Sequence, residues 1–231
     1  PLGPRYQLND HFGYQVRLYY NAKIWEHDCT LVPTYDVCEG RLQSDDAYGI
    51  GFALHFGRIF HHPKDKEYVY RYQTPDGAQH FFCDTRNYSR DMNDPLCAGG
   101  YTEDADRIKI ERLADDQWVV HPGDGTKITL AYPYGTLELG GIPVWWTTRI
   151  EDYTGGQYLN IQYSGRMIDY LEDSTGRRIE FTNDSYGTQI DFPAYLGGLA
   201  TYHLEYGSAT LTDPSNGSDY RPTVRRLMGI T

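Results

Sequence analysis

Hydrophobic and polar residues alternate along most of the chain, and this period of two is typical of half-buried β-strands. Leu159, Ile161 and Tyr163 share one face of such a strand, and the residues between them are polar. The other segments with the same alternation are 16–20, 67–72, 107–111, 127–132 and 203–206. Because every second position is polar, we expect one face of each strand to meet water, as in antiparallel sheets.

Short turns that contain glycine separate these segments. Asp76-Gly77 and Asp124-Gly125 are two-residue signals for β-hairpins. The further turn signals are Gly155-Gly156, Ser164-Gly165, Thr175-Gly176 and Asn216-Gly217. Glycine is favoured there because the common hairpin turns place residues at positive φ. Strands and turns together predict an all-β fold of antiparallel β-hairpins with few or no helices.

A degenerate repeat starts at four of the glycines. After each of them come two mostly polar residues and a short strand that ends in an apolar residue. The four segments are 77–82, 125–130, 176–181 and 187–192, which begin at Gly77, Gly125, Gly176 and Gly187. A single hairpin cannot bury its apolar face alone, so we expect neighbouring copies to pair side by side or stack.

One stretch of the repeat, residues 163–181, carries a more specific pattern. An Asp-x-x-Gly-Arg motif and a following apolar-x-aromatic strand are formed by Asp173, Gly176, Arg177, Ile179 and Phe181. This pattern resembles the RHS/YD repeat of bacterial RHS proteins. Residues 18–25 and 49–59 resemble the segment before such repeats, and residues 227–231 resemble the opening strand of another one.

The chain also departs from the family pattern. Its Tyr-Asp dipeptide, Tyr35-Asp36, lies outside the repeat register, and neither the conserved C-terminal core of the family nor a toxin domain is present in the sequence. The resemblance implies a long hairpin sheet that winds into a shell, which sequesters a C-terminal toxin or forms a rigid scaffold in teneurin-like receptors. Because 231 residues are too few to close a shell, we expect part of one: a large, curved, open sheet.

An open sheet has exposed edges, which offer unpaired backbone groups to another strand. The expected partners are downstream repeats or a toxin domain of the same polypeptide, or copies of the chain itself through sheet edges. We expect residues 1–62 to form N-terminal strands that lead into degenerate hairpin repeats over residues 63–231, within one continuous domain.

Four cysteines fall into two local pairs, Cys29 with Cys38 and Cys83 with Cys97. An even count at short separations in an aromatic, glycine-rich chain favours disulfides, and therefore a secreted or cell-surface location. Four free, buried thiols are the alternative, and four cysteines allow three connectivities. The two pairs lie in long excursions over residues 25–48 and 84–106, each expected to be held by a disulfide.

The composition excludes several classes of protein. Tyrosine is its strongest bias, with 22 of 231 residues, and glycine accounts for 24. Disordered chains are poor in aromatic residues, whereas this one contains 15%. No apolar stretch reaches the roughly 18 residues of a membrane span. A net charge of −11 without a Lys/Arg-rich run argues against nucleic acid as a partner.

Candidate metal ligands are few. The clustered acids that offer oxygen ligands for calcium are Asp91, Asp94, Glu103, Asp104 and Asp106. Their spacing is not that of an EF-hand, which favours a solvated acidic loop. His61-His62 precedes Pro63 with no acidic residue in ligand register, which is typical of a solvated turn. We therefore expect neither a metal nor a cofactor.

No catalytic motif is found either. Ser164 does not lie in a Gly-x-Ser-x-Gly elbow, and the sequence has no phosphate loop of the Gly-x-x-x-x-Gly-Lys type. Glycoside hydrolysis needs two carboxylates at a set separation, and the sequence does not single out a pair from its 32 acids. We therefore expect a protein that is not an enzyme, with a glycoside-active β-enzyme as a remaining alternative.

Aromatic residues suggest a binding surface. Trp145 and Trp146 are adjacent, so in a strand one ring can fill the core while the other stays exposed. An aromatic row of Tyr68, Tyr70 and Tyr72 would complete a surface that stacks on sugars or grips a protein. The other interpretation is a cross-strand ladder that stabilises the sheet, which is favoured because the alternation is not local to one site.

The leading interpretation is a non-enzymatic, extracellular β-repeat scaffold of an RHS/YD-like protein, which encloses or presents other parts of that protein. One alternative is a carbohydrate-binding or adhesive β module, for which glycans are the partners. Another is a self-assembling subunit of an extracellular polymer that pairs through its sheet edges.

Overall fold

The computed structural model describes residues 1–21, 25–32, 35–42, 47–61, 69–83, 102, 106, 108–114, 116–131, 143–194, 197–211 and 223–231. For residues 25–32 and 35–42 the description covers the backbone alone. Nearly all regular structure in these ranges is β-strand, which confirms the predicted all-β fold.

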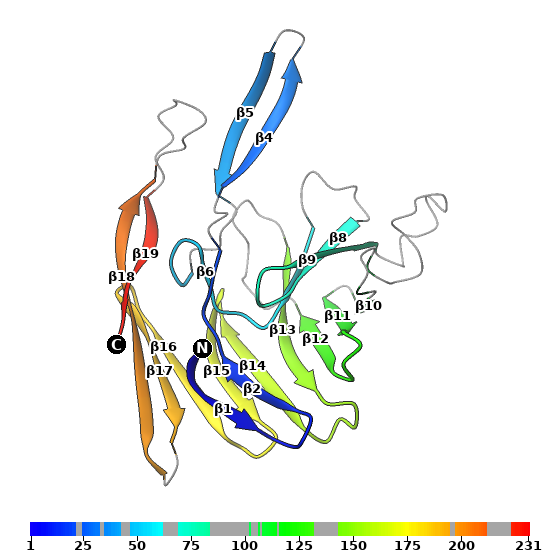
Figure 1. Ribbon diagram of the computed structural model, residues 1–231, viewed down its shortest axis with the longest axis vertical. Helices are drawn as coiled ribbons and strands as arrows, with labels where there is room; N and C mark the ends of the chain where they lie inside the picture. Colours follow the sequence, from blue (N-terminus) through cyan, green and yellow to red (C-terminus); the bar gives the residue numbers. More distant parts are fainter. Residues whose placement is uncertain are drawn as a thin grey trace.

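Figure 1 labels most of the strands, which are numbered in chain order. They are β1 (Leu2–Gln7), β2 (Gly13–Val16), β3 (Tyr19–Tyr20), β4 (Trp25–Val32), β5 (Tyr35–Leu42), β6 (Phe52–Ala53), β7 (Arg58–Phe60), β8 (Val69–Gln73), β9 (Gln79–Cys83), β10 (Lys109–Ala114), β11 (Gln117–His121), β12 (Lys127–Ala131), β13 (Val144–Glu151), β14 (Tyr158–Ser164), β15 (Met167–Asp173), β16 (Arg178–Asn183), β17 (Gly187–Pro193), β18 (Leu199–Thr210) and β19 (Thr223–Ile230).

A large antiparallel sheet dominates the molecule. Ten consecutive strands, β10 to β19, pair with their neighbours in sequence order. Three more strands, β7 to β9, join this sheet through β13 and bring it to thirteen strands. The hairpins predicted at Asp76-Gly77 and Asp124-Gly125 are present, and both glycines have positive φ. Figure 1 shows the sheet as a curved surface.

The sheet branches at β13. Val144–Trp146 pairs with β7, whereas Arg149–Glu151 pairs with β14. Thr147 lies between the two halves with no exposed surface, and its hydroxyl contacts the carbonyl oxygens of Phe56 and Gly57 at 3.0 Å each. The hydroxyl thereby satisfies backbone carbonyl groups at the point where the pairing of β13 changes from β7 to β14.

Two apolar clusters fill the molecule. One joins β13–β18 with β1, β2 and the segment 47–54, and the other joins β7–β9 with β10–β13. The alternating residues Leu159, Ile161 and Tyr163 all lie in the first cluster, as the sequence predicts. The partly buried Ile150 packs against both clusters.

The first cluster contains the N-terminal hairpin of β1 and β2, which contributes Leu2, Tyr6, Tyr14 and Val16. Figure 1 shows this hairpin lying across β14 and β15. The chain thus covers one face of its own sheet, while the opposite face carries polar residues such as Arg149, Glu172 and Arg178. Because a hairpin alone is marginal, its stability depends on this packing.

Strands β4 and β5 form a separate hairpin in which eight residues of each strand pair in register. Neither strand pairs with any other strand of the described ranges, and Figure 1 shows the hairpin projecting as an arm. Within the excursion expected over residues 25–48, residues 25–32 and 35–42 are thus regular strands.

The expected boundary after residue 62 falls between two strands of the large sheet, because β7 pairs with both β8 and β13. No helix in the described part of the chain is long and apolar enough to cross a membrane.

Candidate functional site

The turn that follows β15 shows what the Asp-x-x-Gly-Arg motif does. The Oδ1 atom of Asp173 accepts hydrogen bonds from the Thr175 and Arg177 amides at 2.9 and 3.2 Å and from the Thr175 hydroxyl at 2.5 Å. Gly176 takes a φ of 82°, which favours glycine. Ile179 and Phe181 of the next strand are buried in the first cluster. The motif therefore closes a hairpin and places two apolar residues in the core.

The same device recurs along the sheet. Asp152 accepts hydrogen bonds from the Thr154 amide and hydroxyl and from the Gln157 amide. Asp124 accepts from the amide and hydroxyl of Thr126, and Asp184 accepts from the amides of Tyr186 and Gly187. An aspartate two or three positions before a donor forms such a turn with its own backbone. The hairpins are thus repeats in chemistry as well as in spacing.

Two of these carboxylates also hold the N-terminal hairpin. Tyr14 donates its hydroxyl to Asp173 Oδ2 at 2.9 Å, and Asn9 donates its amide to Asp152 Oδ2 at 2.9 Å. Burial, and then the neighbouring Asp173 carboxylate, raise the pKa of Tyr14 well above its usual range, so the phenol stays a donor.

The Arg177 side chain completes this contact. Its guanidinium lies 3.5 Å from Asp173 Oδ2 and 4.5 Å from the ring centre of Tyr6. Tyr6 in turn donates its hydroxyl to the carbonyl of Pro193 at 2.8 Å. The sequence places Asp173 in the repeat motif, but no local pattern points to Asn9 and Tyr14, whose partners lie more than 140 residues away.

Gly187 differs from the other repeat glycines. It begins β17 without a positive φ, whereas Gly77, Gly125 and Gly176 have positive values. A Cβ atom at residue 187 would lie 2.6 Å from the carbonyl oxygen of Leu204. Gly187 thus closes the turn that begins at Asp184, but the close approach of β18, rather than a positive φ, explains why this residue is glycine.

The two adjacent tryptophans point to opposite faces of β13, but both are buried. Trp145 lies in the second cluster, 5.9 Å from the ring of Trp118, and Trp146 lies in the first cluster, 5.8 Å from Tyr163. The prediction that one ring stays exposed is wrong. Both faces of β13 are covered because the sheet branches at this strand.

The predicted tyrosine row also belongs to the core. Tyr70 and Tyr72 are buried in the second cluster, and Tyr70 lies 5.1 Å from Trp118 and 6.0 Å from both Phe82 and Trp145. Tyr68 lies outside the described residues. Tyr70 and Tyr72 therefore match the cross-strand ladder rather than an exposed binding surface.

Three of the four cysteines lie within the described residues. Cys29 and Cys38 face each other directly in the register of β4 and β5. Cys83 ends β9, is buried and is disulfide-bonded, and no described cysteine is free. Cys97 lies outside the described residues, so its pairing with Cys83 stays a prediction.

Most of the candidate metal ligands lie outside the described residues. Asp91, Asp94, Glu103 and Asp104 lie beyond the described ranges, and Asp106 is exposed. Within those ranges, no group of three His, Cys, Asp or Glu side chains has the arrangement of a metal site. His61 packs edge-on against Tyr70 at 5.5 Å, and His62 is not described.

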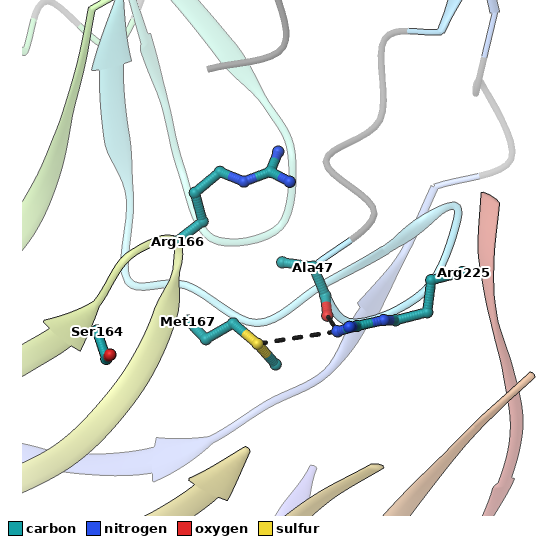
Figure 2. A pocket seen from close by; sticks show the side chains of 5 residues that line it. All are labelled: Ala47, Ser164, Arg166, Met167 and Arg225. Carbon is teal, nitrogen blue, oxygen red and sulfur yellow. Dashed lines mark hydrogen bonds between the residues drawn. The ribbon is translucent and has the colours of Figure 1, made fainter. Parts of the chain in front are cut away.

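A pocket of about 330 Å³ lies where the turn between β14 and β15 meets β19. Figure 2 shows its five lining residues, which are Ala47, Ser164, Arg166, Met167 and Arg225. Two are arginines and none is acidic, although acids outnumber bases by 32 to 21 in the whole chain. No sequence pattern singles out this site, because its residues come from three distant segments.

Arg225 is held in this pocket by several contacts. Its Nη1 atom donates to the carbonyl of Ala47 at 2.7 Å and lies 3.8 Å from Met167 Sδ (Figure 2). The guanidinium lies 4.9 Å from the ring centre of Tyr206. The backbone around it is also fixed, because Ile50 donates its amide to the Arg225 carbonyl at 2.8 Å. The cation therefore has a defined position at the pocket wall.

No protein-family model matches the chain, and no curated protein matches it.

Proposed function

We propose that this chain is a non-enzymatic, extracellular β-repeat scaffold segment of an RHS/YD-like protein, which encloses or presents other parts of that protein. The observation that carries the proposal is the run of ten sequence-consecutive antiparallel strands whose hairpin turns repeat the same aspartate-capped chemistry. Such a run extends by adding hairpins at its end, as repeat architectures do.

The curvature and the covered face support the same role. The apolar face of β13–β18 is filled by the chain's own N-terminal hairpin and by the segment 47–54. A rigid, self-filled sheet suits a wall or scaffold, because its burial does not depend on a ligand.

An extracellular location makes two disulfides part of the proposal, Cys29–Cys38 and Cys83–Cys97. Directly opposite residues of an antiparallel pair have Cα atoms about 4.5–5.5 Å apart, which lies within the range that a disulfide spans. Peptide mapping by mass spectrometry without reductant should recover both linked pairs. Free thiols at Cys29 and Cys38 in protein isolated from its native source would contradict the extracellular assignment.

The carbohydrate-binding alternative has little support from the positions of its aromatic residues. Of the five aromatic residues on which it rested, Trp145, Trp146, Tyr70 and Tyr72 are buried. The polymer alternative keeps one observation, since the last strand, β19, exposes Met228 and Ile230.

The scaffold role is tested on the complete polypeptide that the gene encodes. Residues 1–231 and the remaining polypeptide are expressed separately, mixed, and digested with a protease of broad specificity. The proposal predicts that the two parts associate and that residues 1–231 slow the digestion of the remainder at least tenfold. Absence of association, equal digestion rates, or a gene that encodes nothing beyond residue 231 would contradict the enclosing role.

A further inference from the structure

The charge of Arg225 is not balanced by any carboxylate of the described residues. Arg149, Arg177 and Arg178 each lie within 4.0 Å of an Asp or Glu oxygen, whereas Arg225 has no such partner. It is nevertheless half-buried and fixed by a carbonyl, a thioether and an aromatic ring. A desolvated cation without a counterion is costly, so a cation held in this way favours an anionic partner.

The geometry also leaves donors available. A guanidinium has five N–H donors, and the contacts with the Ala47 carbonyl and the Met167 thioether use the two on Nη1. The Nε and Nη2 edge of a guanidinium is the fork that binds a planar carboxylate through two parallel hydrogen bonds. Ser164 adds a hydroxyl to the same pocket wall, and Arg166 also lines the pocket.

We propose that the pocket formed by Arg225, Arg166, Ser164, Met167 and Ala47 binds a carboxylate on a ligand the size of one amino-acid residue or one sugar ring. The volume of about 330 Å³ lies at the small end of ligand pockets. The single unbalanced charge of Arg225 matches one carboxylate. The side chain of an acidic peptide and a uronic acid share this chemistry.

The test is a titration followed by NMR, with the Nε–Hε signal of Arg225 and the amide signal of Met167 as reporters. N-acetylglutamate and glucuronate are the charged probes, and N-acetylglutamine and glucose are their uncharged counterparts. We expect saturable shifts with at least one charged probe, with a dissociation constant on the order of 1 mM, as one charged contact gives. Neither uncharged probe should shift these signals.

Matched variants separate the pocket from general charge effects. Arg225→Gln should weaken binding at least tenfold, and Arg225→Lys, which keeps the charge and loses the planar fork, should weaken it less. Arg178→Gln is the control, because Arg178 already pairs with Glu180 on the opposite face of the sheet. Binding of N-acetylglutamate alone assigns an acidic peptide, and binding of glucuronate alone assigns an acidic sugar.

Three results would overturn the proposal. The first is no saturable shift with either carboxylate. The second is binding by Arg225→Gln and Arg225→Lys that is as tight as binding by the wild type. The third is binding of inorganic phosphate in preference to both carboxylates. If Arg225→Gln does not fold, Arg225→Lys is compared with Arg178→Gln. Weaker binding in Arg225→Lys alone supports the proposal, and equal binding in the two variants contradicts it.

Discussion

The carboxylate of Asp173 connects three parts of the molecule. One oxygen closes the turn between β15 and β16, and the other binds Tyr14 of the N-terminal hairpin and the Arg177 guanidinium. The side chain is fully buried, so each of these donors depends on it for a partner. Removal of a buried charge partner leaves the remaining groups unsatisfied, which costs more than the contact itself contributes.

The substitution Asp173→Ala should therefore lower the free energy of unfolding by about 3 kcal/mol, measured by urea denaturation. Asp124→Ala is the matched control, because Asp124 caps a similar turn but is exposed and binds only Thr126. The control should lose far less stability. Equal losses in the two variants would show that Asp173 acts only as a local turn residue.

His55 is buried in its neutral form. Its Nδ1 accepts the Gly57 amide at 3.0 Å, and its ring packs edge-on against Trp146. Burial, and then the nearby Arg58 charge, lower the pKa of His55 to about 3, while Asp76 acts weakly in the opposite direction. In the unfolded chain the pKa returns to about 6.5, so the unfolded state binds more protons between these values.

Stability should therefore be complete above pH 6.5 and fall as the pH drops below it, by up to about 1.4 kcal/mol per pH unit. His55→Asn keeps an acceptor for Gly57 but does not titrate, so its stability should depend less on pH between 6.5 and 5. Urea denaturation at several pH values measures the difference. His11→Gln, at an exposed site, is the control. Parallel profiles for wild type and His55→Asn would contradict the burial of a neutral imidazole.

At the scale of elements, the pairing of β17 with β18 depends on a close backbone approach at Gly187. Gly187→Ala should cost about 2 kcal/mol, because the new methyl group would overlap the Leu204 carbonyl oxygen at 2.6 Å. Gly229→Ala is the matched control, since residue 229 is also a strand glycine and its nearest atom lies at 3.6 Å. Thermal denaturation compares the two. An equal effect would exclude crowding as the cause.

The β4–β5 arm should be independent of the remaining structure. Its strands pair only with each other among the described strands. Replacement of residues 25–42 by a short Gly-Ser linker should change the free energy of unfolding by less than about 1 kcal/mol, because distant, unconnected parts contribute independently. Loss of the cooperative unfolding transition in this variant would show that the arm is part of the core.

Strands and turns can be predicted here because alternation and turn chemistry are local. The alternation of Leu159, Ile161 and Tyr163 predicts their common burial, and Thr175-Gly176 predicts the turn. The burial of both Trp145 and Trp146 cannot be predicted in this way. It results from the branching of the sheet at β13, a long-range pairing that leaves no local signal.

At the scale of the whole molecule, the covered face and the pocket also depend on long-range contacts that local sequence patterns do not predict. A period of two predicts that β14–β18 have an apolar face, but it does not say that β1 and β2 cover it. The pocket unites Ala47, Met167 and Arg225, which are separated by more than 50 residues in the sequence. Ala47 lies outside the large sheet, whereas Met167 and Arg225 lie on β15 and β19, so only tertiary packing brings the three together.

The account of a self-filled scaffold requires the N-terminal hairpin to unfold together with the sheet that it covers. Native-state hydrogen exchange tests this directly, because it gives an opening free energy for each protected amide. We predict that the amides of β1 and β2 that bond each other exchange with the same free energy as those of β14–β17, and that Asp173→Ala lowers both together. Exchange of β1 and β2 several kcal/mol more readily than β14–β17 would contradict the account, because the hairpin would then be a detachable segment.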